Sequence, residues 1–110
     1  MSAEEKLKEL NLDLPAAPKP MGVYKLIVFD GHIAYLSGHG PLRTDGTLVV
    51  GRVGEDMDLQ EGYDAARQTG LALLSTLRNA LGSLERVKRV VKTLGFVNSA
   101  DDFVDQPKVI

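Results

Sequence analysis

Three side chains in the first half of the sequence could do chemistry: His32, Ser37 and His39. Ser37 and His39 are the residue types of a nucleophile and a general base. Residues two apart along a strand share a face but are separated by a rise of about 6.6 Å, whereas a nucleophile and its base must approach within about 2.6–3.2 Å. The spacing therefore argues against a Ser–His dyad. The alternative is a strand end where the serine hydroxyl bonds the backbone and the histidine is exposed.

Metal and cofactor chemistry has little support in the same segment. The chain has no Cys and two His, and catalytic zinc sites typically use about three protein ligands. The run Gly38-His39-Gly40-Pro41-Leu42-Arg43 begins like a dinucleotide-binding fingerprint, but Arg43 stands where the third glycine belongs and no helix opens after it. We therefore expect neither a bound metal nor a cofactor.

Length and charge limit the class of protein. The chain has 110 residues, of which 44 % are hydrophobic and 25 % charged, and a net charge of −2, which predicts one globular domain with no general attraction to nucleic acid or anionic membrane. No apolar run approaches the ~20 residues that span a bilayer, and the N-terminus is acidic where a signal peptide is basic. We expect a cytoplasmic, soluble protein.

One basic run has no interleaved aromatic residues, so we interpret it as the solvated edge of a strand or helix. It consists of Arg86, Lys88, Arg89 and Lys92.

A β-hairpin is expected to position Ser37 and His39. The β-branched and aromatic runs Val23–Phe29 and His32–Gly38 flank an Asp30-Gly31 turn. A second Asp-Gly pair, Asp45-Gly46, precedes a short third strand over Thr47–Gly51.

Two capping boxes predict helices. Ser2 and Glu5 begin a short helix over Ala3–Leu10, which a proline-rich linker over Leu14–Pro20 follows. Asp58 and Glu61 begin a long helix that runs to about Leu81, where Gly82 fits the left-handed end position. Its predicted apolar stripe consists of Tyr63, Ala66, Gly70, Leu73, Leu74, Leu77 and Leu81.

The segment from Leu84 to Val97 fits two structures. Apolar residues at helical spacing would stripe a helix, but its β-branched residues and Gly95 favour a brief turn at Ser83–Val87 and then a strand over Lys88–Val97. A helix is expected to start near Asp101. The sequence stops at Ile110, which leaves the apolar groups of that strand and helix without partners.

Four stretches, in this order and spacing, resemble the RidA/YjgF family, which also carries the label endoribonuclease L-PSP. They are Tyr35–Pro41, Gly51–Gly54, the helix with Ala65-Ala66-Arg67 and Leu81-Gly82, and Val97–Phe103. The common family motif is Ser-Gly-Gln-x-Pro, so His39 replaces a glutamine.

The resemblance implies an α+β, chorismate-mutase-like fold: a mixed sheet with helices packed on one face. Residues 1–20 would form an N-terminal extension and residues 21–110 the family domain. It further implies a homotrimer with a small pocket at each interface, where family members hydrolyse reactive imines and enamines to 2-oxo acids and ammonia. Tyr24, Ser37, Gly38 and His39 match the positions that would bind the small carboxylate substrate.

The family's carboxylate-binding arginine lies in an Ala-Arg-Ser type motif beyond the second helix. Arg43, Arg52 and Arg67 are not at that position, so we expect the fold to be incomplete at the C-terminus and the deaminase site with it. A non-catalytic module that binds a small carboxylate metabolite is the alternative. RNA cleavage is the least favoured function because the chain is acidic and has no His–His or His–Lys constellation.

Overall fold

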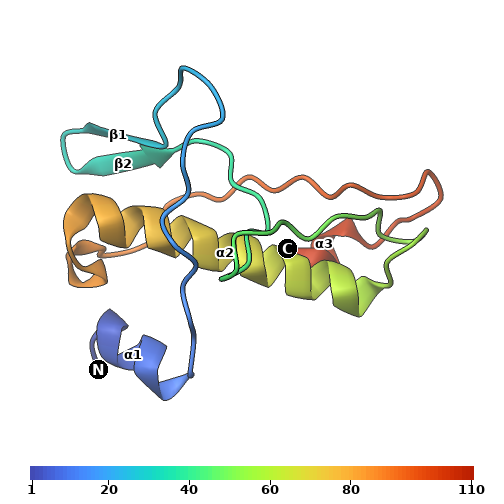
Figure 1. Ribbon diagram of the computed structural model, residues 1–110, viewed down its shortest axis with the longest axis horizontal. Helices are drawn as coiled ribbons and strands as arrows, with labels where there is room; N and C mark the ends of the chain where they lie inside the picture. The colour runs from blue at the N-terminus through green and yellow to red at the C-terminus, as the bar shows by residue number, and fades with distance from the viewer.

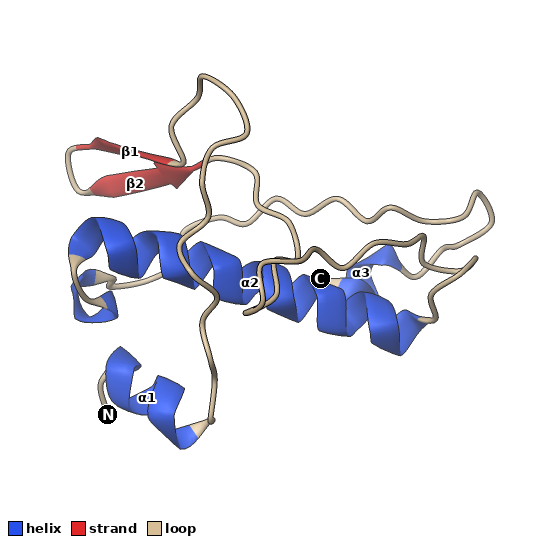
Figure 2. Cartoon of the chain, in the orientation of Figure 1, coloured by secondary structure: helices blue, strands red, loops and turns tan.

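The structure is a computed structural model that describes residues 1–110. Its elements are α1 (Ala3–Glu9), β1 (Ile27–Asp30), β2 (Ile33–Leu36), α2 (Leu59–Leu81), the short 3₁₀ helix η1 (Leu84–Arg86) and α3 (Gln106–Val109). Helix α2 runs through the whole molecule, with the β1–β2 hairpin on one side of it and α1 on the other (Figures 1 and 2). The architecture is α+β, and every other element is placed relative to α2.

The predicted hairpin is present, with shorter strands and a shifted turn. β1 and β2 pair antiparallel from Ile27–Leu36 to Asp30–Ile33, and the loop is Gly31-His32 rather than Asp30-Gly31. Gly31 has φ +59°, a left-handed value that suits glycine in a two-residue hairpin turn. The sheet consists of this antiparallel pair. The expectation of a mixed sheet is wrong at the level of strands, because parallel pairing is limited to isolated bridges of Val53.

Both ends of α2 form as predicted. The Asp58 carboxylate accepts a hydrogen bond from the Glu61 N–H (2.8 Å) and the Glu61 side chain accepts one from the Asp58 N–H (3.2 Å). Gly82 ends the helix at φ +81°, and its N–H donates to the Arg78 carbonyl. These caps satisfy backbone groups that have no partner within the helix.

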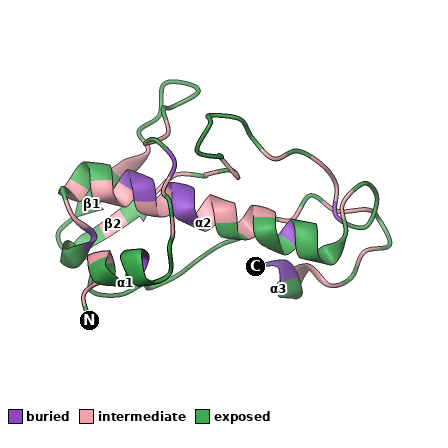
Figure 3. Cartoon of the chain, turned by 60° about the horizontal axis from the view of Figure 1, so that its bottom comes forward, coloured by how far each residue is buried: buried purple, intermediate pink, exposed green.

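The apolar stripe predicted on α2 is not the face of the helix that is most buried. Tyr63 is 47 % exposed, and the stripe's leucines are half-buried. The buried positions are Gly62, Leu71, Ala72, Ser75 and Thr76, shown in purple in Figure 3. The helix has neighbours on two sides, and the buried positions combine Leu71 with small residues that admit close approach.

The N-terminal segment is fixed against α2. Ser2 and Glu5 form the predicted capping box, and Leu7 of α1 is buried at 7 % exposure. Residues 11–26 contain no helix or strand, which agrees with the linker predicted over Leu14–Pro20 but not with the strand predicted to begin at Val23. In this linker the Pro15 carbonyl accepts a hydrogen bond of 2.7 Å from the buried Ser75 hydroxyl.

The expected third strand, Thr47–Gly51, does not form. Leu48 makes one isolated bridge, to Leu42, because the Asp45-Gly46 turn folds this segment back on the loop before it rather than onto the hairpin. The Asp45 carboxylate accepts bonds from the N–H and the hydroxyl of Thr47, and these bonds lower the pKa of Asp45.

The expected strand over Lys88–Val97 is also absent. None of these ten residues takes part in any hydrogen bond, and Val90, Leu94 and Phe96 are 73–87 % exposed. The segment is extended and runs beside α2 (Figure 1). β-branched residues favour the extended conformation, but a strand exists only where a neighbour supplies the ladder.

The helix expected near Asp101 begins later. A turn closed by the Phe103 N–H and the Ala100 carbonyl precedes it, and α3 starts at Gln106. Pro107 lies in the first turn, where its missing N–H costs no helical bond. η1 occupies the turn predicted at Ser83–Val87.

Amide hydrogen exchange should separate these regions. Amides of Lys88–Val97 are expected to exchange at close to the rate of an unstructured peptide because they lack hydrogen bonds, while amides in the middle of α2 should be protected by several orders of magnitude. Slow exchange in Lys88–Val97 at low protein concentration would contradict this description.

Candidate functional site

The end of β2 carries most of the predicted site residues. The N–H and hydroxyl of Ser37 both reach the Leu26 carbonyl, at 2.9 and 3.4 Å. The hydroxyl is thus bonded to the backbone, as the alternative to a Ser–His dyad predicts. The contact between the two residues runs from the His39 ring to the Ser37 carbonyl, so the geometry agrees with the argument against a dyad.

His39 is half-buried and bonded at both ring nitrogens, so the expectation that it is exposed is wrong. Nδ1 lies 2.8 Å from the Ser37 carbonyl oxygen and Nε2 lies 2.7 Å from the Thr76 hydroxyl. A carbonyl only accepts, so Nδ1 carries a proton, and in the tautomer with its one proton on Nδ1 the Nε2 atom accepts from the Thr76 hydroxyl. Thr76 is 3 % exposed. The contact joins the strand end to the C-terminal half of α2.

Gly38 and Tyr24 leave polar groups available. The N–H groups of Gly38 and His39 have no partner in the chain, and a Cβ on Gly38 would meet nothing within 4 Å. Tyr24 is 44 % exposed, and its phenolic oxygen accepts from the Met21 N–H at 3.1 Å. The phenolic O–H therefore remains free to donate. These groups are hydrogen-bond donors, which is the chemistry that recognises a carboxylate.

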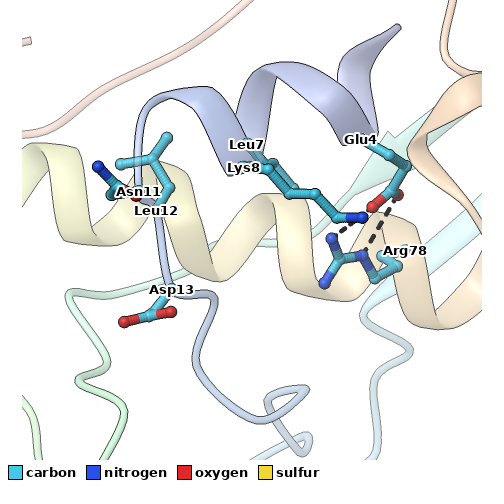
Figure 4. A pocket seen from close by; sticks show the side chains of 7 residues that line it. All are labelled: Glu4, Leu7, Lys8, Asn11, Leu12, Asp13 and Arg78. Carbon is cyan, nitrogen blue, oxygen red and sulfur yellow. Dashed lines mark hydrogen bonds and ion pairs between the residues drawn. The ribbon is translucent and has the colours of Figure 1, made fainter.

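One surface hollow lies between α1 and α2. It has a volume of about 400 Å³ and is lined by Glu4, Leu7, Lys8, Asn11, Leu12, Asp13 and Arg78 (Figure 4). The Arg78 guanidinium donates to the Glu4 carboxylate through Nε (3.3 Å) and Nη2 (2.5 Å), and the Leu84 N–H donates to the same carboxylate (2.9 Å). These bonds, the one from Arg78 first, hold the pKa of Glu4 below its ordinary value of 4.5. The pair fastens α1 to α2.

A second hollow, of about 440 Å³, lies beside the first half of α2. Its lining residues are Arg43, Thr44, Val49, Met57, Glu61, Asp64, Ala65 and Gln68. The charged groups there already have partners: Glu61 caps the helix, Asp64 accepts from Gln60, and Arg43 donates to Thr47 and Leu48. Neither hollow includes Tyr24, Ser37 or His39.

Two of the motif stretches meet at the far end of α2. The Arg52 guanidinium donates to the Ser99 carbonyl (2.8 Å), and the Asn98 side-chain amide donates to the Gly51 carbonyl (2.9 Å). Gly54 has φ +89°, and a Cβ there would lie 3.1–3.4 Å from the Phe103 ring and Cβ. Arg52 is therefore engaged in holding two loops together.

No three His, Cys, Asp or Glu side chains gather closely enough to hold a metal ion. No helix combines the length and apolar character needed to cross a membrane.

The fold and these motifs define the class of protein, and the comparisons agree. Residues 4–110 match the model of the family described as "YjgF/chorismate_mutase-like, putative endoribonuclease". The chain belongs to this family.

Three relatives are similar over nearly the whole chain. "Protein TCP17" of Trypanosoma cruzi is 40 % identical over 103 residues, which cover 94 % of this chain and 64 % of TCP17. The structure of a "putative endoribonuclease" from Shewanella oneidensis MR-1 superposes with a TM-score of 0.94 at 29 % identity, covering 99 % of this chain and 72 % of that one. The protein Atu1372 of Agrobacterium tumefaciens, of unknown function, gives a TM-score of 0.83 at 35 % identity, covering 96 % and 64 %. The chain thus spans less than two thirds of TCP17, and its chorismate-mutase-like fold is confirmed.

Sequence reasoning missed Thr76 and Ser75, the buried hydroxyls to which the strand end and the linker are bonded. A signal was present, because a Ser-Thr pair lies inside a leucine-rich helix and buried hydroxyls need partners. The periodicity argument considered only apolar residues.

The Glu4–Arg78 pair predicts a pH dependence of stability. Because the folded-state pKa of Glu4 is lowered, its stabilisation is complete above about pH 4.5 and is lost as pH falls through the lowered folded value. Glu4→Gln should lower the melting temperature by a few degrees at pH 7, and the difference from wild type should shrink as the pH falls below about 4.5. Glu9→Gln, which breaks an exposed pair with Lys6, is the control and should change little. A constant difference from pH 7 to pH 3 would contradict the assignment.

Gly54 offers a test of the contact between the two motif stretches. Gly54→Ala should destabilise the protein by about 1–2 kcal/mol because its φ is positive and the methyl group meets Phe103. Gly38→Ala is the matched control, since open space surrounds that position. Urea denaturation of the two variants measures the difference, and equal midpoints would refute the reasoning.

Proposed function

We propose that this chain forms the substrate-binding part of a protein that hydrolyses small 2-imino or enamino acids to 2-oxo acids and ammonia. The observation that carries the proposal is the end of β2, where the family motif presents N–H groups of Gly38 and His39 that have no partner in the chain, with open space beside Gly38. Backbone N–H groups of this kind bind carboxylate oxygens. The free phenolic O–H of Tyr24 adds a third hydrogen-bond donor, which would also bind a carboxylate oxygen.

The proposed reaction needs few protein groups. Water adds to the carbon of the C=N bond, the carbinolamine transfers a proton to nitrogen, and the C–N bond breaks to give ammonia and a carbonyl. Imines are electrophilic, so holding the carboxylate and orienting the water supplies much of the acceleration. In this proposal Tyr24, Ser37, Gly38 and His39 form the wall of the substrate site.

The proposal includes a homotrimer whose interfaces complete the pocket. Ten of 110 residues are buried, which leaves a small core for a chain of this length. The hairpin exposes Val28, Phe29, Ile33 and Tyr35 at 47–55 %, an apolar surface that association of copies would cover. A cytoplasmic location is part of the same proposal and rests on the sequence expectation.

A second candidate, a non-catalytic carboxylate-binding module, is favoured by one observation. The Ser37 hydroxyl and both ring nitrogens of His39 are used by protein groups, so no side chain at the strand end is free to act as a base. RNA cleavage has weaker support. The name "putative endoribonuclease" belongs to a relative, and the net charge of −2 opposes binding to RNA.

Ammonia release from freshly generated 2-iminopropionate tests the proposal, and this assay and the calorimetry below use the whole protein of which the chain forms the substrate-binding part. Tyr24→Phe should lower kcat/KM about 5- to 10-fold, the value of one hydrogen bond. Tyr63→Phe is the matched control: Tyr63 has a similar exposure of 47 % but lies near the start of α2, far from the hairpin (Figure 1).

Titration calorimetry with pyruvate separates the two candidates. Binding together with turnover supports the hydrolase, and binding without turnover supports the module. Neither binding nor turnover by the wild-type protein would overturn both.

A further inference from the structure

Between Ser37 and Leu42, one side chain makes the hydrogen bond that connects the segment after β2 to α2. Ser37 is the last residue bonded to the neighbouring strand region, through Leu26. The next hydrogen bond from the segment to α2 is the one from the Gln68 amide to the Leu42 carbonyl. Between these two points, the His39 ring makes the hydrogen bond that ties the backbone to the helix.

We propose that His39 is a positioning residue that fixes the substrate-binding N–H groups of Gly38 and His39, and not a group that contacts the substrate through its ring. This inference rests on the proposed function and assigns its carboxylate recognition to the backbone. The His39 Nδ1–H donates a hydrogen bond to the Ser37 carbonyl, and Nε2 accepts one from the Thr76 hydroxyl. The ring therefore sets both the conformation of Ser37–His39 and its distance from α2.

The Thr76 end of this contact is rigid. Thr76 is 3 % exposed and lies inside the C-terminal half of a 23-residue helix, and a β-branched side chain has few rotamers in a helix. A backbone donor held in a fixed direction binds a carboxylate better than a mobile one because less conformational entropy is lost on binding.

The chemistry of the contact also identifies its best replacement. It needs one donor toward Ser37 and one acceptor toward Thr76, which a neutral imidazole supplies and a carboxamide also carries. His39→Gln should therefore retain pyruvate affinity within about threefold, whereas His39→Leu, which fills space without polar atoms, should lose about tenfold.

Thr76 variants test the contact from the helix side. Thr76→Val keeps the shape and removes the hydroxyl, so it should also raise the Kd for pyruvate about tenfold, and Thr76→Ser should restore it. The double variant with His39→Leu should be no weaker than either single variant, because both break the same contact. In turnover assays the loss should appear mainly in KM.

Ser75→Ala is the control for a purely structural effect. Ser75 is the neighbouring buried hydroxyl and bonds Pro15 in the N-terminal linker, so its removal costs a comparable buried bond without touching the strand end. We expect it to lower the melting temperature as Thr76→Val does and to leave pyruvate affinity unchanged. If Thr76→Val and Ser75→Ala affect pyruvate equally, the positioning role is refuted.

Nitrogen-15 spectra of the imidazole separate this inference from the proposed function. We expect the Nδ1–H tautomer in wild type, and in Thr76→Val a shifted Nε2 resonance together with shifted amide resonances of Gly38 and His39. These results would support the contact even if pyruvate does not bind, in which case the proposed function alone fails. An Nε2–H tautomer, or spectra unchanged by Thr76→Val, would overturn the inference.

Discussion

The structure depends on the hydrogen bonds of two adjacent buried hydroxyls in the C-terminal half of α2. Successive residues on a helix point about 100° apart, so Ser75 and Thr76 face different neighbours: the Pro15 carbonyl in the linker and the His39 ring after β2. A buried hydroxyl without a partner costs free energy. Each bond therefore specifies where a segment from the first half of the chain docks on the helix.

The remaining attachments are polar as well, because the core is small. Glu4 and Arg78 fasten α1 to the C-terminal half of α2, while Arg52 and Asn98 tie the loop before α2 to the loop that follows the drawn-out segment. Hydrogen bonds are directional and require a partner at a defined position. Arg52 and Asn98, which belong to the family motifs, therefore hold two loops together and do not line a hollow.

At the end of β2, the side chains and the backbone N–H groups differ in whether they have hydrogen-bond partners. The side chains of Ser37 and His39 are used within the protein, while backbone N–H groups beside them are unpaired. Such a site is suited to holding an anion in place and offers no free base. A glutamine, which is common at the position of His39 in the family motif, carries a donor and an acceptor as the imidazole does, so either side chain can make two such hydrogen bonds.

The sequence predicted the elements that depend on interactions between residues close together in the chain. Both capping boxes, the left-handed end at Gly82 and the hairpin follow from residues within a few positions of each other. The α+β fold was predictable from motif order, which the comparisons confirm. Only the tertiary structure decided that Lys88–Val97 has no strand partner, that the buried face of α2 is the one with Ser75 and Thr76, and that His39 bonds a residue 37 positions away. Pairing, burial and long-range hydrogen bonds depend on which segments meet in space, and no periodicity within a segment encodes that.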